Sequence, residues 1–397
     1  MSSLSQRLHQ TLDELRAAGT HKALRHLEVP TGPTTRIENV GEVIVFCSNN
    51  YLGLADHPEV VEAGREGLRR YGAGTASVRF ICGTFTCHRE LEERLAAFLG
   101  TEAALTYVSC WNANEGLLAT LVEPGDAIVS DELNHASIID AARLARQATK
   151  KVFRHSDLAA LEQALDEVPE SRVKLVVTDG VFSMEGDVAR LPDLVSVCRQ
   201  RDATLIVDDS HGVGVLGRGG RGAHEHFGLP ARAPDGIGIL TGTLGKSLGG
   251  AAGGYVAGPQ EVIDFLVQRS RPQLFSNAVP PTVACSAAKA LEILQREPER
   301  VTRLHRNVDS MRTGLRELGY RVLESPTAIL PIIVGDTARA IDLSNRLLRM
   351  GVFVIGFGFP VVPEGTARLR IQMSAAHTEE HIARALDAFR RLREETG

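Results

Sequence analysis

Apolar strand-like segments alternate with helix-like segments from about residue 56 onward, and this alternation limits the chain to few folds. Helical patterns are predicted over 58–70, 88–99, 138–148 and 191–201. Strand patterns are predicted at 103–108, 127–130, 151–153, 173–178, 204–207, 236–241 and 254–257. Strands that alternate with helices favour a parallel arrangement, so we predict an α/β fold whose large domain holds a mostly parallel sheet.

The N-terminal end of the chain predicts a helix that stands apart from this block. Leu4, Leu8, Leu12 and Leu15 recur at helical spacing and indicate an amphipathic helix over 4–17. A linker containing proline and glycine follows, and then a short strand at 43–46.

The C-terminal part predicts a smaller α+β domain. One long helix is expected after Pro280 and Pro281, running through Leu291 to about residue 318. Strand and helix patterns then alternate at 321–323, 329–334, 339–350, 352–355, 368–373 and 379–394. We therefore expect three ranges: an N-terminal helix, linker and strand (1–55), a large domain (56–285) and a small domain (286–397).

Composition excludes several classes of protein. With 43% hydrophobic and 23% charged residues, the chain is close to an average globular protein and is not disordered. A net charge of -5 argues against a nucleic-acid surface. No apolar run approaches the roughly 18 residues of a membrane span, and the N-terminus lacks the apolar core of a signal peptide. The six scattered cysteines read as reduced thiols, so we expect a cytoplasmic protein without membrane or nucleic-acid partners.

Polar and titratable residues follow several of the predicted strands. They form four pairs: Asp131 with His135, Asp179 with Ser183, Asp208 with His211, and Thr243 with Lys246. Ligands of open α/β sheets bind outside the carboxyl ends of the strands, so these pairs predict a binding site at that edge.

Three short motifs suggest other ligands but do not fit them. The glycines of 212–217 match a dinucleotide fingerprint, but the glycine-rich run 218–222 that follows cannot open a good helix. A phosphate-binding loop ending in 245–247 would need glycine at position 240, which is Leu240. The run 224–226, His-Glu-His, lacks metal-ligand spacing and is interpreted as a solvated surface run, so no metal site is expected.

Lys246 and Asp208 together indicate pyridoxal 5'-phosphate (PLP). This cofactor needs a lysine for its Schiff base and a carboxylate for its pyridinium nitrogen. Lys246 then becomes the base once the amino-acid substrate has displaced it. The strand-to-helix junction at Cys110 and Trp111 is a natural phosphate site, and His135 has the imidazole face to cover the ring.

Eight segments of the chain closely resemble the α-oxoamine synthases, which are PLP enzymes of fold type I. They are FCSNNYLGLADHP, ASVRFICGT, DELNHASIID, TDGVFSMEGD, VDDSHGVGVLGRGGRG, TGTLGKSLGGAAGGY, RSRPQLFSN and FPVVPEGTARLRIQMSAAHT. The resemblance covers essentially the whole chain. It implies a PLP-dependent transferase of fold type I and a homodimer whose active site is shared between subunits.

The resemblance also implies roles for the residues around the cofactor. Lys246 matches the Schiff-base lysine and the proton-abstracting base, and Asp208 matches the partner of the pyridinium nitrogen. His211 and Ser183 match residues that contact the 3'-oxygen side of the ring. His135 matches the histidine that stacks on the ring and assists the acyl carbonyl.

Phosphate and substrate contacts are implied in the same way. The backbone amides of Cys110 and Trp111, with the Thr243 hydroxyl, match the phosphate site. Ser276 and Asn277 match residues that reach the phosphate of the neighbouring subunit.

Two further positions match residues that contact the amino-acid substrate. Arg370 matches the residue that clamps the substrate carboxylate, a task that suits a guanidinium fork. Asn49 matches an asparagine near the substrate.

Within the family, the resemblance favours condensation of glycine with acetyl-CoA to 2-amino-3-oxobutyrate and CoA, a reaction of threonine catabolism. Val78 and Phe80 stand where the 5-aminolevulinate branch reads a succinyl carboxylate, with Arg79 between them. Gly212, where the most similar members have alanine, and Trp111, where phenylalanine is usual, depart from that pattern. The alternatives are an 8-amino-7-oxononanoate-forming or other α-oxoamine synthase, a PLP aminotransferase, and a catalytically silent subunit.

Overall fold

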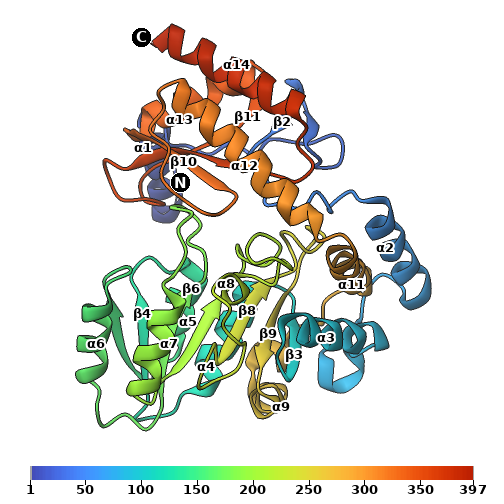
Figure 1. Ribbon diagram of the computed structural model, residues 1–397, viewed down its shortest axis with the longest axis vertical. Coiled ribbons are helices and arrows are strands. Elements are labelled where there is room, and N and C mark those ends of the chain that lie inside the picture. Colours follow the sequence, from blue (N-terminus) through green and yellow to red (C-terminus); the bar gives the residue numbers. More distant parts are fainter. Residues whose placement is uncertain (1, 397) are drawn as a thin grey trace. The chain divides into compact units, whose positions relative to one another are not determined.

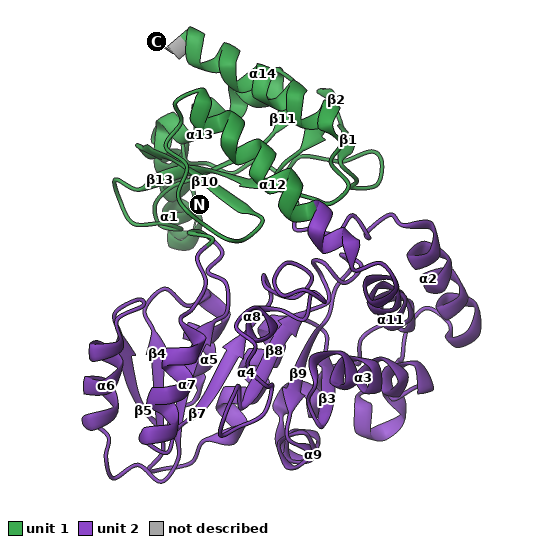
Figure 2. Ribbon diagram, in the orientation of Figure 1, with its two compact units in different colours: residues 1–48, 184–186, 304–397 green, residues 49–183, 187–303 purple. Residues whose placement is uncertain are grey.

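The computed structural model describes residues 2–396 and divides into two compact units (Figure 2). Unit 1 consists of residues 1–48, 184–186 and 304–397, and unit 2 of residues 49–183 and 187–303. Residues 1 and 397, which bound the predicted ranges 1–55 and 286–397, lie outside the described residues.

Unit 1 contains both ends of the chain, so the three predicted ranges do not coincide with the units. The physical reason is strand pairing between distant segments. β1 (Thr34–Ile37) pairs with β2 (Gly41–Val45), and β2 pairs in parallel with β11 (Val352–Phe353). The N-terminal strands therefore belong to the same sheet as a C-terminal one.

Unit 2 is built on a seven-stranded sheet with the order β3-β9-β8-β7-β6-β4-β5 (Figure 1). β9 pairs antiparallel with both its neighbours, and β8, β7, β6, β4 and β5 are parallel to one another. The strands are β3 (Ala103–Tyr107), β4 (Ala127–Asp131), β5 (Thr149–Phe153), β6 (Lys174–Asp179), β7 (Thr204–Asp208), β8 (Ile239–Thr243) and β9 (Gly254–Gly258). Each lies where the sequence predicted a strand, and the mostly parallel α/β sheet is confirmed.

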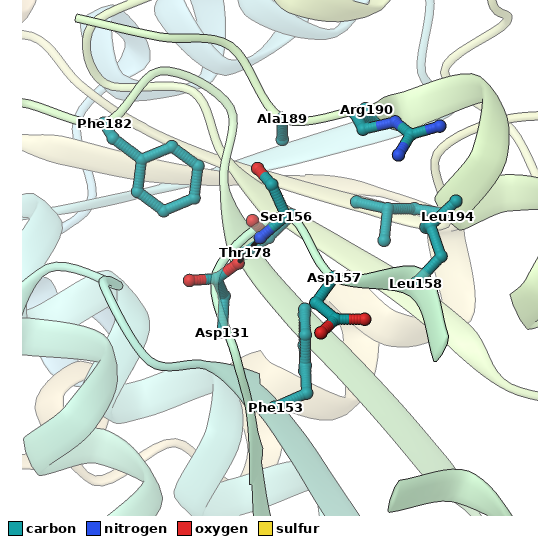
Figure 3. A pocket seen from close by; sticks show the side chains of 10 residues that line it. All are labelled: Asp131, Phe153, Ser156, Asp157, Leu158, Thr178, Phe182, Ala189, Arg190 and Leu194. Carbon is teal, nitrogen blue, oxygen red and sulfur yellow. Dashed lines mark hydrogen bonds between the residues drawn. The ribbon is translucent and has the colours of Figure 1, made fainter. Parts of the chain in front are cut away.

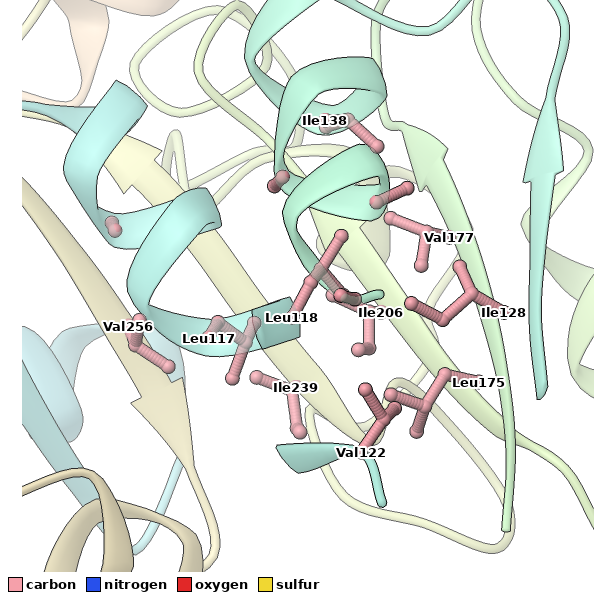
Figure 4. Packing of buried hydrophobic residues seen from close by; sticks show 14 of the residues in the cluster. Leu117, Leu118, Val122, Ile128, Ile138, Leu175, Val177, Ile206, Ile239 and Val256 are labelled. Carbon is pink, nitrogen blue, oxygen red and sulfur yellow. The ribbon is translucent and has the colours of Figure 1, made fainter. Parts of the chain in front are cut away.

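Helices α4 and α5 pack on this sheet through an apolar core (Figure 4). Leu117 and Leu118 of α4 and Ile138 of α5 meet strand residues such as Val177 and Ile206. Full burial of a large apolar side chain stabilises a fold by about 1.5–3 kcal/mol, so this cluster fixes the helices on the sheet. The helices of unit 2 are α2 (Pro58–Tyr71), the π-helical turn η1 (Arg79–Gly83), α3 (Thr86–Leu99), α4 (Cys110–Leu121), α5 (Ala136–Leu144), α6 (Leu158–Asp166), α7 (Leu191–Gln200), α8 (Ala223–His226), α9 (Gln260–Arg269), α10 (Arg271–Phe275) and α11 (Pro281–Arg296).

The single long helix predicted to reach about residue 318 is wrong. α11 ends at Arg296, and α12 (Glu299–Glu317) begins three residues later. Pro298 lies between them, and proline removes a helical hydrogen bond and disfavours helical backbone at the residue before it. The strand predicted at 321–323 is reduced to one bridge between Val322 and Ile332.

Unit 1 combines two small sheets with helices and confirms the α+β prediction. Its second sheet has the order β10-β13-β12, formed by β10 (Ile329–Gly335), β13 (Ala367–Gln372) and β12 (Ile355–Phe357). Its helices include α1 (Ser3–Ala17), α13 (Thr337–Arg349) and α14 (Glu379–Thr396). The leucine-lined side of α1 is exposed. Among residues 2–396, every helix is too short or too polar to cross a bilayer.

Candidate active site

The carboxyl ends of the parallel strands bring several of the predicted site residues together. β6 ends at Asp179, β7 at Asp208 and β8 at Thr243. Asp179 is the register partner of Asp208, and Asp208 is that of Thr241. Side chains from three consecutive strands of the sheet therefore meet at one edge, as the sequence predicted.

A cavity of about 220 Å³ lies at this edge. Its lining residues are Cys110, Trp111, His135, Ser137, Asp179, Ser183, Asp208, Ser210, His211, Thr243 and Lys246. Eight of them were predicted as site residues. Asp179 was predicted at this edge as part of a strand-end pair but was given no role, and Ser137 and Ser210 were not predicted.

Asp208 is buried, and its carboxylate is held by donors on both oxygens. The backbone N–H of Ser210 donates to Oδ1 (3.0 Å), and the Asn114 side-chain amide donates to Oδ2 (2.7 Å). The Cys110 Sγ lies 3.5 Å from Oδ2, and burial raises the pKa of that thiol well above its ordinary value. The cavity therefore offers a fixed carboxylate beside a thiol that stays protonated.

His135 caps helix α5 and lines the cavity at the same time. Its Nδ1 accepts a hydrogen bond from the Ser137 backbone N–H (3.2 Å), so the ring proton is on Nε2. Burial lowers the pKa of His135, which keeps the imidazole neutral. Its own backbone N–H donates to Asp179 (2.7 Å), where burial and the Asp208 charge raise the carboxyl pKa. The Trp111 ring meets the imidazole edge-on at 6.2 Å.

The N-terminus of α4 lies at the cavity. Ser109 caps the helix by accepting from the Asn112 N–H (3.1 Å), while Cys110 and Trp111 occupy the first turn. Unpaired N–H groups and the helix dipole at such an end attract phosphate. A Cβ on Gly254 would lie 2.3 Å from the Cys110 nitrogen, so glycine there lets β9 approach this turn.

His211 has a buried partner that the sequence did not reveal. The Tyr51 hydroxyl lies 2.8 Å from His211 Nδ1, and Tyr51 is fully buried. The two residues are far apart in the sequence, so no local pattern predicts the contact. Asn49, two residues before Tyr51, is not among the residues given above for the cavity.

Three further predicted residues also lie outside that lining set. Ser276 and Asn277 follow α10, and Asn277 forms a bridge with Val78. Arg370 lies on β13 of unit 1, with its guanidinium 4.6 Å from the Phe357 ring. The roles of these three residues and of Asn49 stay predictions.

A smaller cavity of about 10 Å³ lies between β4, β6 and the segment after β5 (Figure 3). Asp131, Ser156 and Phe182 are among its lining residues, and its volume suits a single water molecule. His155 next to Ser156 bonds to Asp131 (3.1 Å) and Asp187 (2.9 Å). Burial opposes a charge on His155, but these two carboxylates raise its pKa to about 10.

The run 224–226 was wrongly interpreted as a solvated surface. His224 is buried, and burial lowers its pKa. The Glu225 carboxylate accepts from the backbone N–H groups of Gly219 and Arg221, so it organises the preceding glycine-rich turn. The next helix after the glycines of 212–217 is the four-residue α8, which agrees with the rejection of a dinucleotide site.

Comparison with known proteins gives consistent matches over the whole chain. The family model for class I and II aminotransferases matches residues 41–389. The 2-amino-3-ketobutyrate coenzyme A ligase of Escherichia coli K12 is 44% identical over 394 residues, 99% of this chain and 98% of that protein. The 8-amino-7-oxononanoate synthase of Symbiobacterium thermophilum is 45% identical over 396 residues, 100% of this chain and 99% of that protein.

A solved structure matches as well. It is a serine palmitoyltransferase variant from S. paucimobilis with a bound PLP–myriocin aldimine. The TM-score is 0.92 at 31% identity, with 100% of both chains covered. The predicted fold type I is confirmed.

Proposed function

Because the chain belongs to the class I and II aminotransferases and, within them, to the α-oxoamine synthases, we propose that it is a PLP-dependent acyltransferase. Its proposed substrates are glycine and acetyl-CoA, and its products 2-amino-3-oxobutyrate and CoA. One observation carries the proposal: a single cavity unites Lys246, the fixed carboxylate of Asp208 and the N-terminus of α4.

The residues of the cavity fit the chemical needs of PLP. Lys246 is the amine for the Schiff base, and Asp208 is the carboxylate for the ring nitrogen. The N–H groups of Cys110 and Trp111 and the hydroxyl of Thr243 would hold the phosphate. His211 and Ser183, which also line the cavity, are available for the 3'-oxygen, so every polar group of the cofactor has a partner of suitable chemistry.

PLP, when bound, supplies an electron sink for the negative charge that develops at the substrate α-carbon. Asp208 holds a proton at the ring nitrogen, and its two donors keep the carboxylate in one orientation. Lys246 takes the proton from the glycine α-carbon. His135 is neutral with its proton on Nε2, so it is a hydrogen-bond donor for the acyl carbonyl oxygen. Arg370 is proposed to hold the glycine carboxylate.

The segment around Arg79 supports a small, uncharged acyl group. The Arg79 guanidinium forms a bidentate pair with Glu92 at 2.8 and 3.1 Å, and both side chains are largely buried. Arg79 also donates to Thr106 (3.1 Å). A cation committed in this way is not available to a succinyl carboxylate, and the side chains of Val78 and Phe80 offer that carboxylate no polar partner.

The second candidate activity is that of an 8-amino-7-oxononanoate synthase. It is favoured by the 45% identity to the Symbiobacterium thermophilum enzyme, which is as high as the 44% identity to the Escherichia coli ligase within one percentage point. Gly212 also favours this candidate, because glycine at this position resembles the 8-amino-7-oxononanoate synthases.

A homodimer with shared active sites is part of the proposal. Phe80, Ile81 and Phe275 are 62%, 67% and 70% exposed, and the bridge between Val78 and Asn277 brings their segments together. Clustered exposed apolar side chains mark protein–protein interfaces. Such an interface would bring Ser276 and Asn277 to the neighbouring site. The six free cysteines agree with a reducing, cytoplasmic setting.

Release of CoA thiol by the purified, PLP-loaded protein tests the function. Glycine, L-alanine and L-serine are each paired with acetyl-, succinyl-, pimeloyl- and palmitoyl-CoA. We expect glycine with acetyl-CoA to be the preferred pair. Preference for alanine with pimeloyl-CoA would assign the second candidate, and no thiol release with any pair would return the chain to an aminotransferase or a silent subunit.

A further inference from the structure

We propose that Asn114 is a positioning residue that holds the Asp208 carboxylate and, by bonding to Ser137, orients the Ser137 hydroxyl toward His135 Nδ1. The inference rests on the proposed function, because PLP is the group that Asp208 and His135 would serve. It assigns a role to a residue that does not line the cavity and that the sequence did not single out.

Every polar atom of the Asn114 side chain is used. The residue is 3% exposed and lies on α4, one helical turn beyond Cys110. Its amide nitrogen donates to Asp208 Oδ2 (2.7 Å) and to Ser137 Oγ (2.9 Å). Its carbonyl oxygen accepts from the Thr241 hydroxyl (2.8 Å). Asn114 therefore links α4 to strands β7 and β8 and to helix α5.

The order of donors and acceptors along this network follows from Asp208. A carboxylate only accepts, so the NH₂ group of Asn114 has to face it. The second N–H of that group goes to Ser137 Oγ, which leaves the Ser137 hydroxyl proton for His135 Nδ1, 2.8 Å away. Nδ1 also accepts from the Ser137 backbone N–H, so the ring proton stays on Nε2.

Asn114 also links the two parts of the proposed cofactor site, the phosphate site at the N-terminus of α4 and the carboxylate of Asp208. The first turn of α4 is the phosphate site, and Asn114 on the next turn fixes the carboxylate proposed for the ring nitrogen. Both functions then depend on one helix. Replacing Asn114 with alanine removes the bond to Oδ2 and leaves a buried carboxylate with one fewer donor, which is costly for a charged group.

The test compares reconstituted proteins by two readouts, PLP affinity and the pH midpoint of the bound cofactor's visible absorbance. We expect Asn114→Ala to lose about tenfold or more in PLP affinity, as for a lost hydrogen bond to a charged group. We expect its pH midpoint to rise by at least about half a unit, because a ring nitrogen held less firmly withdraws less charge. Thr241→Val, which frees only the carbonyl oxygen, should move both readouts in the same direction by less.

Asn307→Ala is the matched control. Asn307 is a buried asparagine of unit 1 that donates to the carbonyl oxygens of Ser374 and His377. Its loss should lower the melting temperature and leave the pH midpoint unchanged. The other titratable groups facing Asp208 stay the same in all variants: Cys110, His135, Asp179, Asp209, Lys246 and Tyr255.

The outcomes separate this inference from the proposed function. If the wild-type protein binds no PLP, the proposed function fails and takes the inference with it. If the wild type binds PLP and Asn114→Ala keeps its affinity and pH midpoint, the inference alone is overturned. An equal midpoint shift in Asn307→Ala would also overturn it, because general loosening would then explain the effect. If Asn114→Ala does not fold, an unchanged midpoint in Thr241→Val decides against the inference.

Discussion

His155 makes the stability of unit 2 depend on pH. Its two ring nitrogens bond to Asp131 and Asp187, and its pKa is raised to about 10 although burial opposes the charge. In the unfolded chain a histidine has a pKa of about 6.5. Protonated His155 therefore makes its full contribution to the free energy of unfolding below about pH 6.5, and this contribution is lost as pH rises through 10.

The size of the stability loss follows from the difference between the pKa of His155 in the unfolded chain and its pKa in the folded protein. Each pH unit above 6.5 removes at most about 1.4 kcal/mol, which gives an upper limit of about 4 kcal/mol at pH 9.5. The His155 side chain is 18% exposed and Asp187 35%, so solvent screening reduces the expected loss to about 2 kcal/mol. For a unit of this size that corresponds to about 4–8 °C in Tm.

Thermal melting of the wild type and His155→Asn at about pH 6 and pH 9.5, with saturating PLP, measures this loss. The wild type should be the more stable protein at pH 6, and its Tm advantage should shrink by about 4–8 °C at pH 9.5. Subtracting the variant cancels the other titrating groups. His9→Asn, on the exposed face of α1, is the control and should change nothing. A wild-type advantage that stays constant between the two pH values refutes the reasoning.

Three further predictions test the site and its surroundings. Gly254→Ala should lower PLP affinity about tenfold in a fluorescence titration, because the new Cβ would meet the Cys110 nitrogen at 2.3 Å. Arg79→Met should destabilise the protein by about 3 kcal/mol in urea unfolding, because the buried Glu92 carboxylate loses its counter-ion and keeps only the two bonds from Thr106, and it should not create thiol release from succinyl-CoA. Lys246→Ala should reduce thiol release by at least about a hundredfold, and a rate near the wild type would refute its role as the base.

The sheet of unit 2 was predictable because its signals are local. Each central strand is a short apolar run bounded by polar residues, such as the run before Asp208, and such runs read as strands buried on both faces. The break between α11 and α12 was harder to predict. Leu291, Leu294, Val301 and Leu304 are all buried, so the apolar periodicity continues across Pro298 and masks the proline.

The pairing of strands that are far apart in the sequence cannot be predicted from local apolar runs. β11 contributes two residues, Val352 and Phe353, to a parallel pair with β2. Nothing in a two-residue strand identifies a partner about three hundred positions away. The composition of unit 1 therefore follows from tertiary contacts, and the predicted boundary near residue 55 missed it.

The residues of the candidate site likewise fall into those that a local pattern predicts and those that only a long-range contact reveals. Asp208, Thr243 and Lys246 were predictable because they follow strands, and the ends of parallel strands meet at one edge. Tyr51 was not, because its contact with His211 joins segments 160 positions apart.

Asn114 shows why sequence patterns do not identify residues that position a catalytic group without lining the cavity. On α4 it lies three and four positions before Leu117 and Leu118, so it shares the helix face that packs on the sheet. In the sequence, an asparagine on an apolar helix face interrupts the hydrophobic pattern and suggests no function. In the structure, this asparagine connects the packed face of α4 to Asp208. Packing of the two leucines fixes the position of α4, and with it the first turn of the helix, where we propose the phosphate binds. The same helix positions Asn114 to donate a hydrogen bond to Asp208. Core substitutions such as Leu117→Ala should therefore disturb both ends of the cofactor site together, although neither leucine lines the cavity.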